Sequence, residues 1–183
     1  MRNLRKNILG LCLVGMGLGV GAPAQAATGV GPYYATPSWD QTFPAATRFI
    51  VLTNMNSEAV LDRETGLVWE KVPSTQNLPW VGASSHCIDR TVGGRRGWRL
   101  PTLQDLLSLI DPTQIDPPQM IAALPPGHPF TVQLSGFWTA TSHPGDATVQ
   151  WAFHLVGGVT AILRKSQQEL PWCVRGGQGP DAQ

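Results

Sequence analysis

The sequence has little charge and no apolar run long enough for a spanning helix. Charged residues make up 14% of its 183 residues, while the 42% apolar content is ordinary for a folded protein. The longest apolar run lies within the first 26 residues, and it is too short and too rich in glycine for a transmembrane helix, which needs about 20 apolar residues. We therefore expect one globular domain, and the twenty glycines and sixteen prolines favour a loop-rich fold over a helical bundle.

The motifs of common enzyme classes are missing too. The chain has no His-Glu-x-x-His zinc motif, no glycine-rich phosphate loop and no Gly-x-Ser-x-Gly nucleophile elbow. The four histidines are scattered without ligand spacing: His86, His128, His143 and His154. We therefore expect no enzymatic activity, no catalytic residue, no metal ligand and no cofactor.

Residues 1–26 are typical of a secretory signal peptide. A positive start (Arg2, Arg5 and Lys6) precedes the apolar run, and Ala24-Gln25-Ala26 resembles a cleavage site. We expect cleavage near Ala26, a secreted or periplasmic product and no membrane span after cleavage. A lipid anchor on Cys12 is a weaker alternative, because bulky Leu11 precedes it.

Removal of the leader changes both the charge and the cysteine count. It takes away three of the thirteen basic residues and none of the twelve acidic ones, which leaves a net charge of −2 and no overall basicity suited to nucleic acid. Two cysteines remain, Cys87 and Cys173, and an exported protein is in a compartment that permits disulfides. We expect these two cysteines to pair.

The central segment predicts a short helix from Thr102 to Ile110. Thr102 and Asp105 have the spacing of an N-terminal capping box, and Asp111-Pro112 should end the helix. Trp98 and Leu100 precede the cap on an extended segment, where they should enter the same core as the apolar face of the helix while Arg99 points away. That face comprises Leu103, Leu106, Leu107 and Ile110.

A second helix should begin at Pro79-Trp80. Trp80, Ala83, Ser84, Cys87 and Ile88 would share its buried face. A basic, glycine-containing loop, residues 89–96, would then lead to Trp98. The proline-rich segment 112–130 should be a long surface loop, with a possible helical turn at 119–124.

Strands are predicted on both sides of these helices. The Asp62-to-Gly66 stretch reads as a hairpin turn between two strands, with a calcium loop as the weaker alternative, because its spacing does not fit an EF-hand. Val149, Trp151, Phe153 and Leu155 should share one strand face, with Gly157-Gly158 turning the chain into the next strand. The predicted strands are 49–52, 59–61, 67–71, 137–141, 149–155, 159–163 and 172–175.

Taken together, these blocks resemble the Lcl C-terminal domain family, the module that ends a bacterial collagen-like adhesin. The resemblance covers about residues 48–177, between an extended arm or linker (27–47) and a tail (178–183). The matching blocks are Asp62-x-x-Thr65-Gly66-Leu67-Val68-Trp69-Glu70-Lys71, Trp80 with Cys87, Trp98-Arg99-Leu100-Pro101-Thr102 with Asp105, Phe137-Trp138-Thr139-Ala140-Thr141, and Cys173-Val174-Arg175-Gly176-Gly177.

The resemblance implies an α+β, C-type-lectin-like fold with two short helices packed on small antiparallel sheets. It also implies a secreted or surface protein, and binding of sulfated polysaccharide as the best-studied activity of the family. The chain departs from the family pattern at 56–59, which replaces a glycine-rich approach to the first hairpin, and at 94–97, which replaces a more acidic loop. It also has no collagen-like Gly-X-Y stalk.

Two hypotheses for function follow. The first is a non-enzymatic binding module for an anionic polysaccharide or a cell-surface partner, which would contact the Arg95/Arg96 loop and the 112–130 segment. The cations of this module would be Arg95 and Arg96, joined by Arg90, Arg164 and Lys165. The second is a structural role in the envelope, in which the 27–47 arm pairs with the sheet of an envelope protein. The remaining family residues should be structural: Gly66, Trp98, Arg99, Thr102, Asp105, Trp138 and Arg175. Most tryptophans should be core, with Trp39 in the arm as a freer candidate for stacking on sugars.

Overall fold

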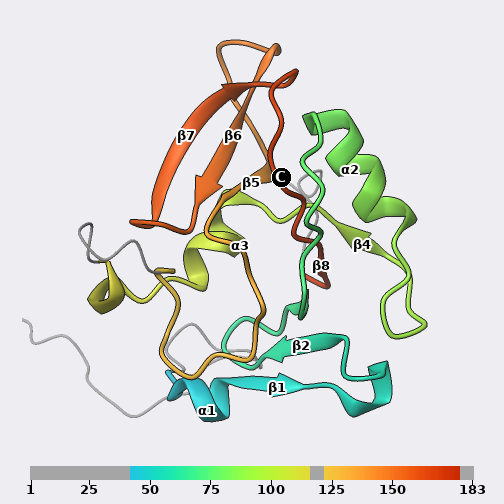
Figure 1. Ribbon diagram of the computed structural model, residues 1–183, viewed down its shortest axis with the longest axis vertical. Helices are drawn as coiled ribbons and strands as arrows, with labels where there is room; N and C mark the ends of the chain where they lie inside the picture. Colours follow the sequence, from blue (N-terminus) through green and yellow to red (C-terminus); the bar gives the residue numbers. More distant parts are fainter. Residues whose placement is uncertain (1–41, 116–121, 178–183) are drawn as a thin grey trace, which may run out of the picture. The chain divides into compact units, whose positions relative to one another are not determined.

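The computed structural model describes residues 42–115 and 122–177 of the chain. In this part the fold is mixed α+β, with three α-helices, two antiparallel sheets and one long-range disulfide, so the predicted fold class is confirmed (Figure 1). The predicted signal peptide, most of the predicted arm and the tail lie outside the described residues. No helix of the described part is long and apolar enough to cross a membrane.

The larger sheet has five strands in the order β1-β2-β3-β8-β4. The first three strands form a meander in chain order, and the strand nearest the C-terminus, β8, lies between β3 and β4. β4 can therefore join this sheet only after β8 has been synthesised. The strands are β1 (Phe49–Val51), β2 (Ala59–Asp62), β3 (Val68–Glu70), β4 (Trp98–Arg99) and β8 (Val174–Arg175).

The smaller sheet has three strands, β5 (Gly136–Ser142), β6 (Val149–His154) and β7 (Val159–Arg164). The β6–β7 connection contains the predicted glycine pair but is longer than the predicted two residues. Strand β6 ends at His154, which pairs with Val159, so the four residues 155–158 make the connection. Gly157 and Gly158 take positive φ values of 72° and 60° in it. The β5–β6 pairing shifts register between Trp138 and Ser142, so β5 is bulged there.

Strand β6 does not have the single buried face that the alternating pattern predicted. Gln150 and Ala152 are fully buried, whereas Val149 and Trp151 are half-buried. The reason is that β6 is a central strand covered on both faces, so the polar Gln150 is accommodated by donating from Nε2 to the carbonyls of Thr139 (3.1 Å) and Thr141 (2.8 Å).

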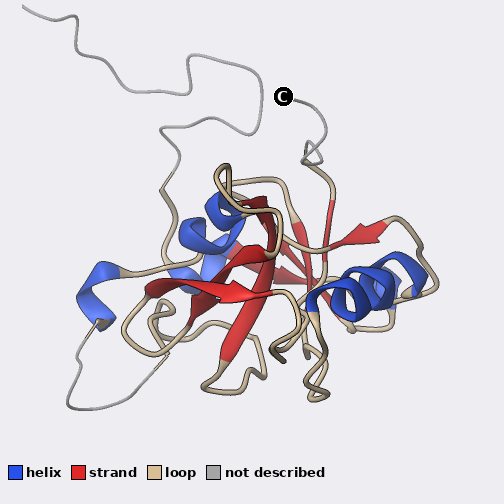
Figure 2. Ribbon diagram, turned by 90° about the horizontal axis from the view of Figure 1, so that it is seen from above, coloured by secondary structure: helices blue, strands red, loops and turns tan. Residues whose placement is uncertain are grey.

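Three α-helices accompany the sheets (Figure 2). Helix α1 (Ala45–Arg48) falls at the end of the predicted arm, so these residues are not extended chain. Helix α2 (Trp80–Asp89) buries Ala83 and Cys87 as predicted but leaves Ile88 62% exposed. Helix α3 (Leu103–Ser108) is shorter than predicted, and the described part of 119–124 is not helical. The described residues also form two 3₁₀ turns, at Thr53–Met55 and Pro112–Gln114.

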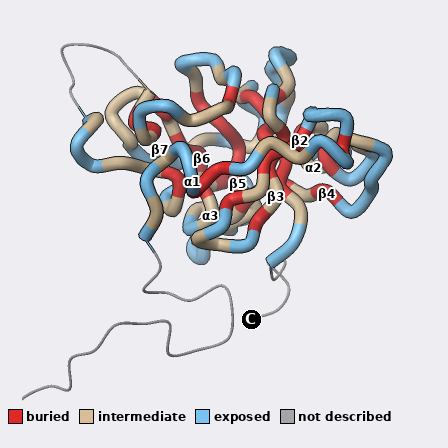
Figure 3. Tube along the Cα trace, turned by 90° about the horizontal axis from the view of Figure 1, so that it is seen from below, coloured by how far each residue is buried: buried red, intermediate tan, exposed pale blue. Residues whose placement is uncertain are grey.

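The core consists of two apolar clusters, because strand residues alternate between two covered faces. Phe137 and Phe153 face one cluster, which also contains Leu106, Leu109 and Trp172. The other cluster contains Trp98, Leu100, Trp138, Cys87 and Cys173. Trp98 and Leu100 are thus buried, but in a different cluster from the apolar face of α3, and Leu107 of that face is 42% exposed. Figure 3 shows the buried segments running through the strands beneath an exposed layer of loops.

The disulfide between Cys87 and Cys173 is formed, as expected. Its Cα atoms are 5.4 Å apart, and it joins α2 to the residue before β8 across 86 positions of sequence. Both cysteines are fully buried in the second cluster. The crosslink therefore fastens the helix to the five-stranded sheet beside β8, the strand next to the edge strand β4.

Candidate functional site

The exposed arginines predicted to bind a ligand lie on a tight turn, residues 91–97, which we call the arginine turn. Val92 and Arg95 form an isolated antiparallel bridge with reciprocal backbone hydrogen bonds. Gly93 and Gly94 take positive φ values of 56° and 71° between them, as a two-residue turn requires. Arg95 and Arg96 follow directly, and both are exposed.

Three hydrogen bonds hold this turn on the domain. The Gly93 N–H donates to Glu58 Oε2 (2.6 Å), the indole N–H of Trp98 donates to the Arg95 carbonyl (2.8 Å), and Arg175 Nε donates to the Arg96 carbonyl (2.8 Å). Trp98 is itself buried and therefore fixed. The backbone that carries the two arginines is consequently preorganised, which lowers the entropy cost of binding.

Arg175 brings a third guanidinium to the arginine turn. It lies opposite Trp98 in the β4–β8 pairing, so β8 comes beside residues 95 and 96. Sequence reasoning assigned Arg175 a structural role only, which its bond to Arg96 supports, but missed that it adds charge here. No local sequence pattern could have placed Arg175 beside the arginine turn, because its position depends on the pairing of β8 with β4.

Arg90, by contrast, has a buried partner. Its Nε donates to Glu70 Oε1 at 2.7 Å, and the Glu70 side chain is only 1% exposed, while its other oxygen accepts from the Cys173 N–H. A buried carboxylate needs such a partner, so Arg90 chiefly neutralises Glu70. Arg90 is therefore a poor ligand residue.

Arg164 and Lys165 lie at the opposite end of α2 from the arginine turn (Figure 1). The Lys165 carbonyl accepts from the N–H of Trp80, the first residue of α2, and its ammonium lies 4.5 Å from the centre of the Trp80 ring. Ten helical residues span about 15 Å at 1.5 Å per residue. The five predicted cations are thus not one patch.

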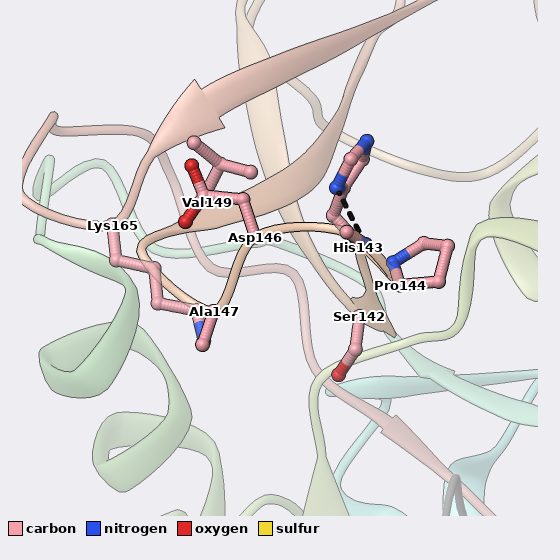
Figure 4. A pocket seen from close by; sticks show the side chains of 8 residues that line it. Ser142, His143, Pro144, Asp146, Ala147, Val149 and Lys165 are labelled. Carbon is pink, nitrogen blue, oxygen red and sulfur yellow. Dashed lines mark hydrogen bonds between the residues drawn. The ribbon is translucent and has the colours of Figure 1, made fainter.

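A hollow of about 270 Å³, which we call the tip hollow, lies beside Lys165 at the β5–β6 connection. It is lined by residues 142–147, Val149 and Lys165 (Figure 4). Asp146 Oδ1 accepts from both the N–H and the hydroxyl of Thr148 at 2.7 Å. These bonds, together with His143 and Arg164, lower the pKa of Asp146, so it remains a carboxylate.

The other predicted family residues make contacts within the fold. Arg99 Nη1 contacts Asp105 Oδ2 at 2.8 Å, and Asp105 also completes the capping box with Thr102, as predicted. The indole N–H of Trp138 donates to the Leu78 carbonyl, and Gly66 takes the positive φ of 72° that its turn requires.

The hairpin turn that invited a calcium interpretation is held by protein groups. Asp62 is fully buried and accepts from Arg48 Nε and Nη2, each at 2.8 Å, and from Thr65 Oγ1 and the Glu64 N–H. Its oxygens are therefore engaged, which supports the structural turn. In the described part of the chain, no three His, Cys, Asp or Glu side chains gather as a metal site would require.

The histidines are dispersed as well. Burial lowers the pKa of His86 and of His128, which keeps both neutral near pH 7, and Arg90 adds to the effect at His86. His154 lies beside Glu169, whose pKa is raised by burial. Of the six tryptophans assigned to the core, Trp80 and Trp151 are only half-buried, and Trp39 lies outside the described residues.

Comparison with known families gives one match. A family model described as the Lcl C-terminal domain matches residues 58–175, which include both sheets except β1, the disulfide and the arginine turn. Among curated proteins, none matches the chain.

Proposed function

Because the chain belongs to the Lcl C-terminal domain family, we propose that it is a non-enzymatic binding module that recognises an anionic, sulfated polysaccharide through the arginine turn. The buried disulfide indicates an extracytoplasmic domain, since such crosslinks persist in oxidising compartments. A polysaccharide outside the cell is accessible to such a domain.

One observation carries the proposal. Arg95 and Arg96 are exposed on a backbone held by three hydrogen bonds, with Arg175 beside them. Guanidinium groups donate paired hydrogen bonds that match sulfate and carboxylate oxygens. Two or three of them on a rigid turn bind a repeating anion better than flexible lysines would.

Retention on immobilised heparin tests the proposal. The protein should be retained at low salt and eluted by added salt, because exposed charges are screened. The variant Arg95→Ala/Arg96→Ala should lose roughly tenfold or more in affinity, since a hydrogen bond to a charged group is worth about 1.5–3 kcal/mol.

The matched control is Arg63→Ala/Lys71→Ala, which removes the same charge from positions outside the turn. It should elute close to the wild type. Equal losses in the two variants would mean that only net charge matters, and the proposed site would then be wrong.

A second candidate function is assembly with an envelope protein, which the edge strand of the smaller sheet favours. Strand β7 lies at the edge of its sheet, and Val159 and Ile162 on it are 53% and 46% exposed. Such an edge can accept a strand from a partner. Co-purification with an envelope protein that is lost on Ile162→Lys, or on deletion of residues 27–47, would support this candidate.

A further inference from the structure

The tip hollow is separate from the arginine turn, and its walls are held in place by aromatic rings. The Lys165 ammonium lies over the Trp80 ring at 4.5 Å, and the His143 ring packs against Trp151 with centroids 6.1 Å apart. This packing explains why Trp80 and Trp151 are only half-buried: each supports a polar side chain at the surface. Lys165 and His143 therefore stand on two sides of the hollow in fixed positions (Figure 4).

The polar groups of the hollow include both donors and an acceptor. Asp146 uses Oδ1 for Thr148, and no hydrogen bond from the described residues engages its Oδ2. His143 Nδ1 accepts from the Gly145 N–H at 3.3 Å, so Nε2 is the nitrogen that carries the proton and donates. Lys165 adds an ammonium donor, and the Ser142 hydroxyl can either donate or accept a hydrogen bond.

The size and charge of the hollow restrict its ligand. About 270 Å³ is just below the range of about 300–1,000 Å³ that holds drug-sized molecules, so it suits a single ring. Asp146 would repel a ring that carries several sulfates, whereas Lys165 and neighbouring Arg164 can offset one negative group. Donors and an acceptor around one ring suit a molecule with several hydroxyls.

From these observations we propose that the tip hollow binds one unsulfated, hydroxyl-rich sugar residue bearing at most one carboxylate, as a second contact on the polysaccharide that the arginine turn binds. Asp146 accepts a sugar hydroxyl, His143 Nε2 donates to another, and Lys165 binds a hydroxyl or the carboxylate. This inference rests on the proposed function. Because α2 separates the two sites by about 15 Å, only an oligomer reaches both, and the second contact then acts at high effective concentration.

NMR titration of the ¹⁵N-labelled protein with a short hyaluronan oligosaccharide, which has carboxylates and hydroxyls but no sulfate, tests the hollow by itself. The amide signals of Lys165 and of residues 142–149 other than Pro144, which has no N–H, should shift, and those of 93–96 should not. The variant Asp146→Asn/Lys165→Met should lose at least tenfold in affinity. Its asparagine can still accept from Thr148 and its methionine can still pack on Trp80, so the loop is kept. The control Asp89→Asn/Lys71→Met should behave as the wild type.

The outcomes separate the two proposals. If the oligosaccharide shifts no signal around the hollow at millimolar concentration, or shifts them equally in Asp146→Asn/Lys165→Met, the hollow is not a sugar site, while heparin retention through Arg95 and Arg96 can stand. If heparin retention is independent of Arg95 and Arg96 while the hollow still binds, the proposed function fails and the link between the sites fails with it. Stronger shifts with free glycine than with the oligosaccharide would assign the hollow to a zwitterion and overturn the inference.

Discussion

Two adjacent glycines decide the geometry of the arginine turn, and they do so for different reasons. Both have positive φ, but a Cβ on Gly93 would lie 2.6 Å from the backbone Cα and O of Met55, whereas a Cβ on Gly94 would have nothing within 4 Å. Gly94 is thus needed only for its conformation. Gly93 is needed for conformation and for space.

Alanine at each position should therefore have unequal effects. Gly94→Ala should cost about 1–2 kcal/mol in free energy of unfolding, the cost of a left-handed L-residue. Gly93→Ala should cost about 1–3 kcal/mol more, because the backbone of Met55 has to move. Urea unfolding of the two variants measures this difference, and equal losses would show that the contact with Met55 is not tight.

Burial of Glu169 makes the stability of the folded protein depend on pH. The pKa of Glu169 is raised in the folded protein, mainly by burial, with a smaller opposing effect from His154. The folded state therefore binds a proton more tightly than the unfolded state, so this contribution to stability is present below about pH 4.5 and is lost as the pH rises through the folded pKa.

At neutral pH the partly buried Glu169 carboxylate destabilises the folded state, and the variant Glu169→Gln removes this destabilisation because glutamine carries no charge. The melting temperature should rise relative to the wild type at pH 7, and the difference should shrink toward pH 4, as thermal unfolding at both values can show. Asp89→Asn, at an exposed carboxyl, is the control. A Glu169→Gln variant that is less stable at pH 7 would mean that the attraction to His154 outweighs burial.

Among the elements, α3 depends most on a local signal. The Thr102 hydroxyl accepts from the Asp105 N–H at 3.1 Å, and Asp105 Oδ2 accepts from the Thr102 N–H at 2.9 Å. Thr102→Ala should destabilise the protein by about 1 kcal/mol, whereas Thr102→Ser should retain most of the stability. Chemical denaturation compares them, and equal behaviour of the alanine and serine variants would exclude a capping role.

The elements with local signals were the ones that the sequence predicted well. The capping box predicted α3, and Gly157-Gly158 predicted the β6–β7 hairpin, because caps and tight turns are specified by a few neighbouring residues. The buried face of β6 was not predictable in this way, since Gln150 is accommodated by carbonyls of the bulged β5 that no local pattern reveals. α3 ends before Asp111-Pro112 because its last turn tightens: the N–H groups of Leu109 and Ile110 bond to carbonyls three residues back, which is not the α-helical pattern.

In the candidate site, too, some features follow from local sequence and others from tertiary packing. Exposure of Arg95 and Arg96 follows from the glycine-rich loop, but the partnership of Arg90 with buried Glu70, and the arrival of Arg175, depend on tertiary packing. The tip hollow has no sequence signature, because His143 and Lys165 become neighbours only through the β6–β7 pairing.

Over the whole molecule, the disulfide joins parts that the chain order keeps far apart. For a closed loop of this size, with a sequence separation of 86 between the cysteines, the chain-entropy estimate is roughly 4–5 kcal/mol. Cys87→Ala/Cys173→Ala should lose about that much stability in denaturant titrations. Alkylation of the folded wild type under non-reducing conditions should label neither sulfur, and labelling of both would contradict the crosslink.

We propose that a rigid, disulfide-fastened domain presents Arg95, Arg96 and Arg175 to an anionic polysaccharide. The most direct measurement is the affinity for heparin as a function of salt, in the wild type and in Arg95→Ala/Arg96→Ala. We predict affinity that falls steeply with salt in the wild type and a weaker affinity with a shallower salt dependence in the variant. Undetectable binding by the wild type at low salt, or identical curves for both proteins, would contradict the account.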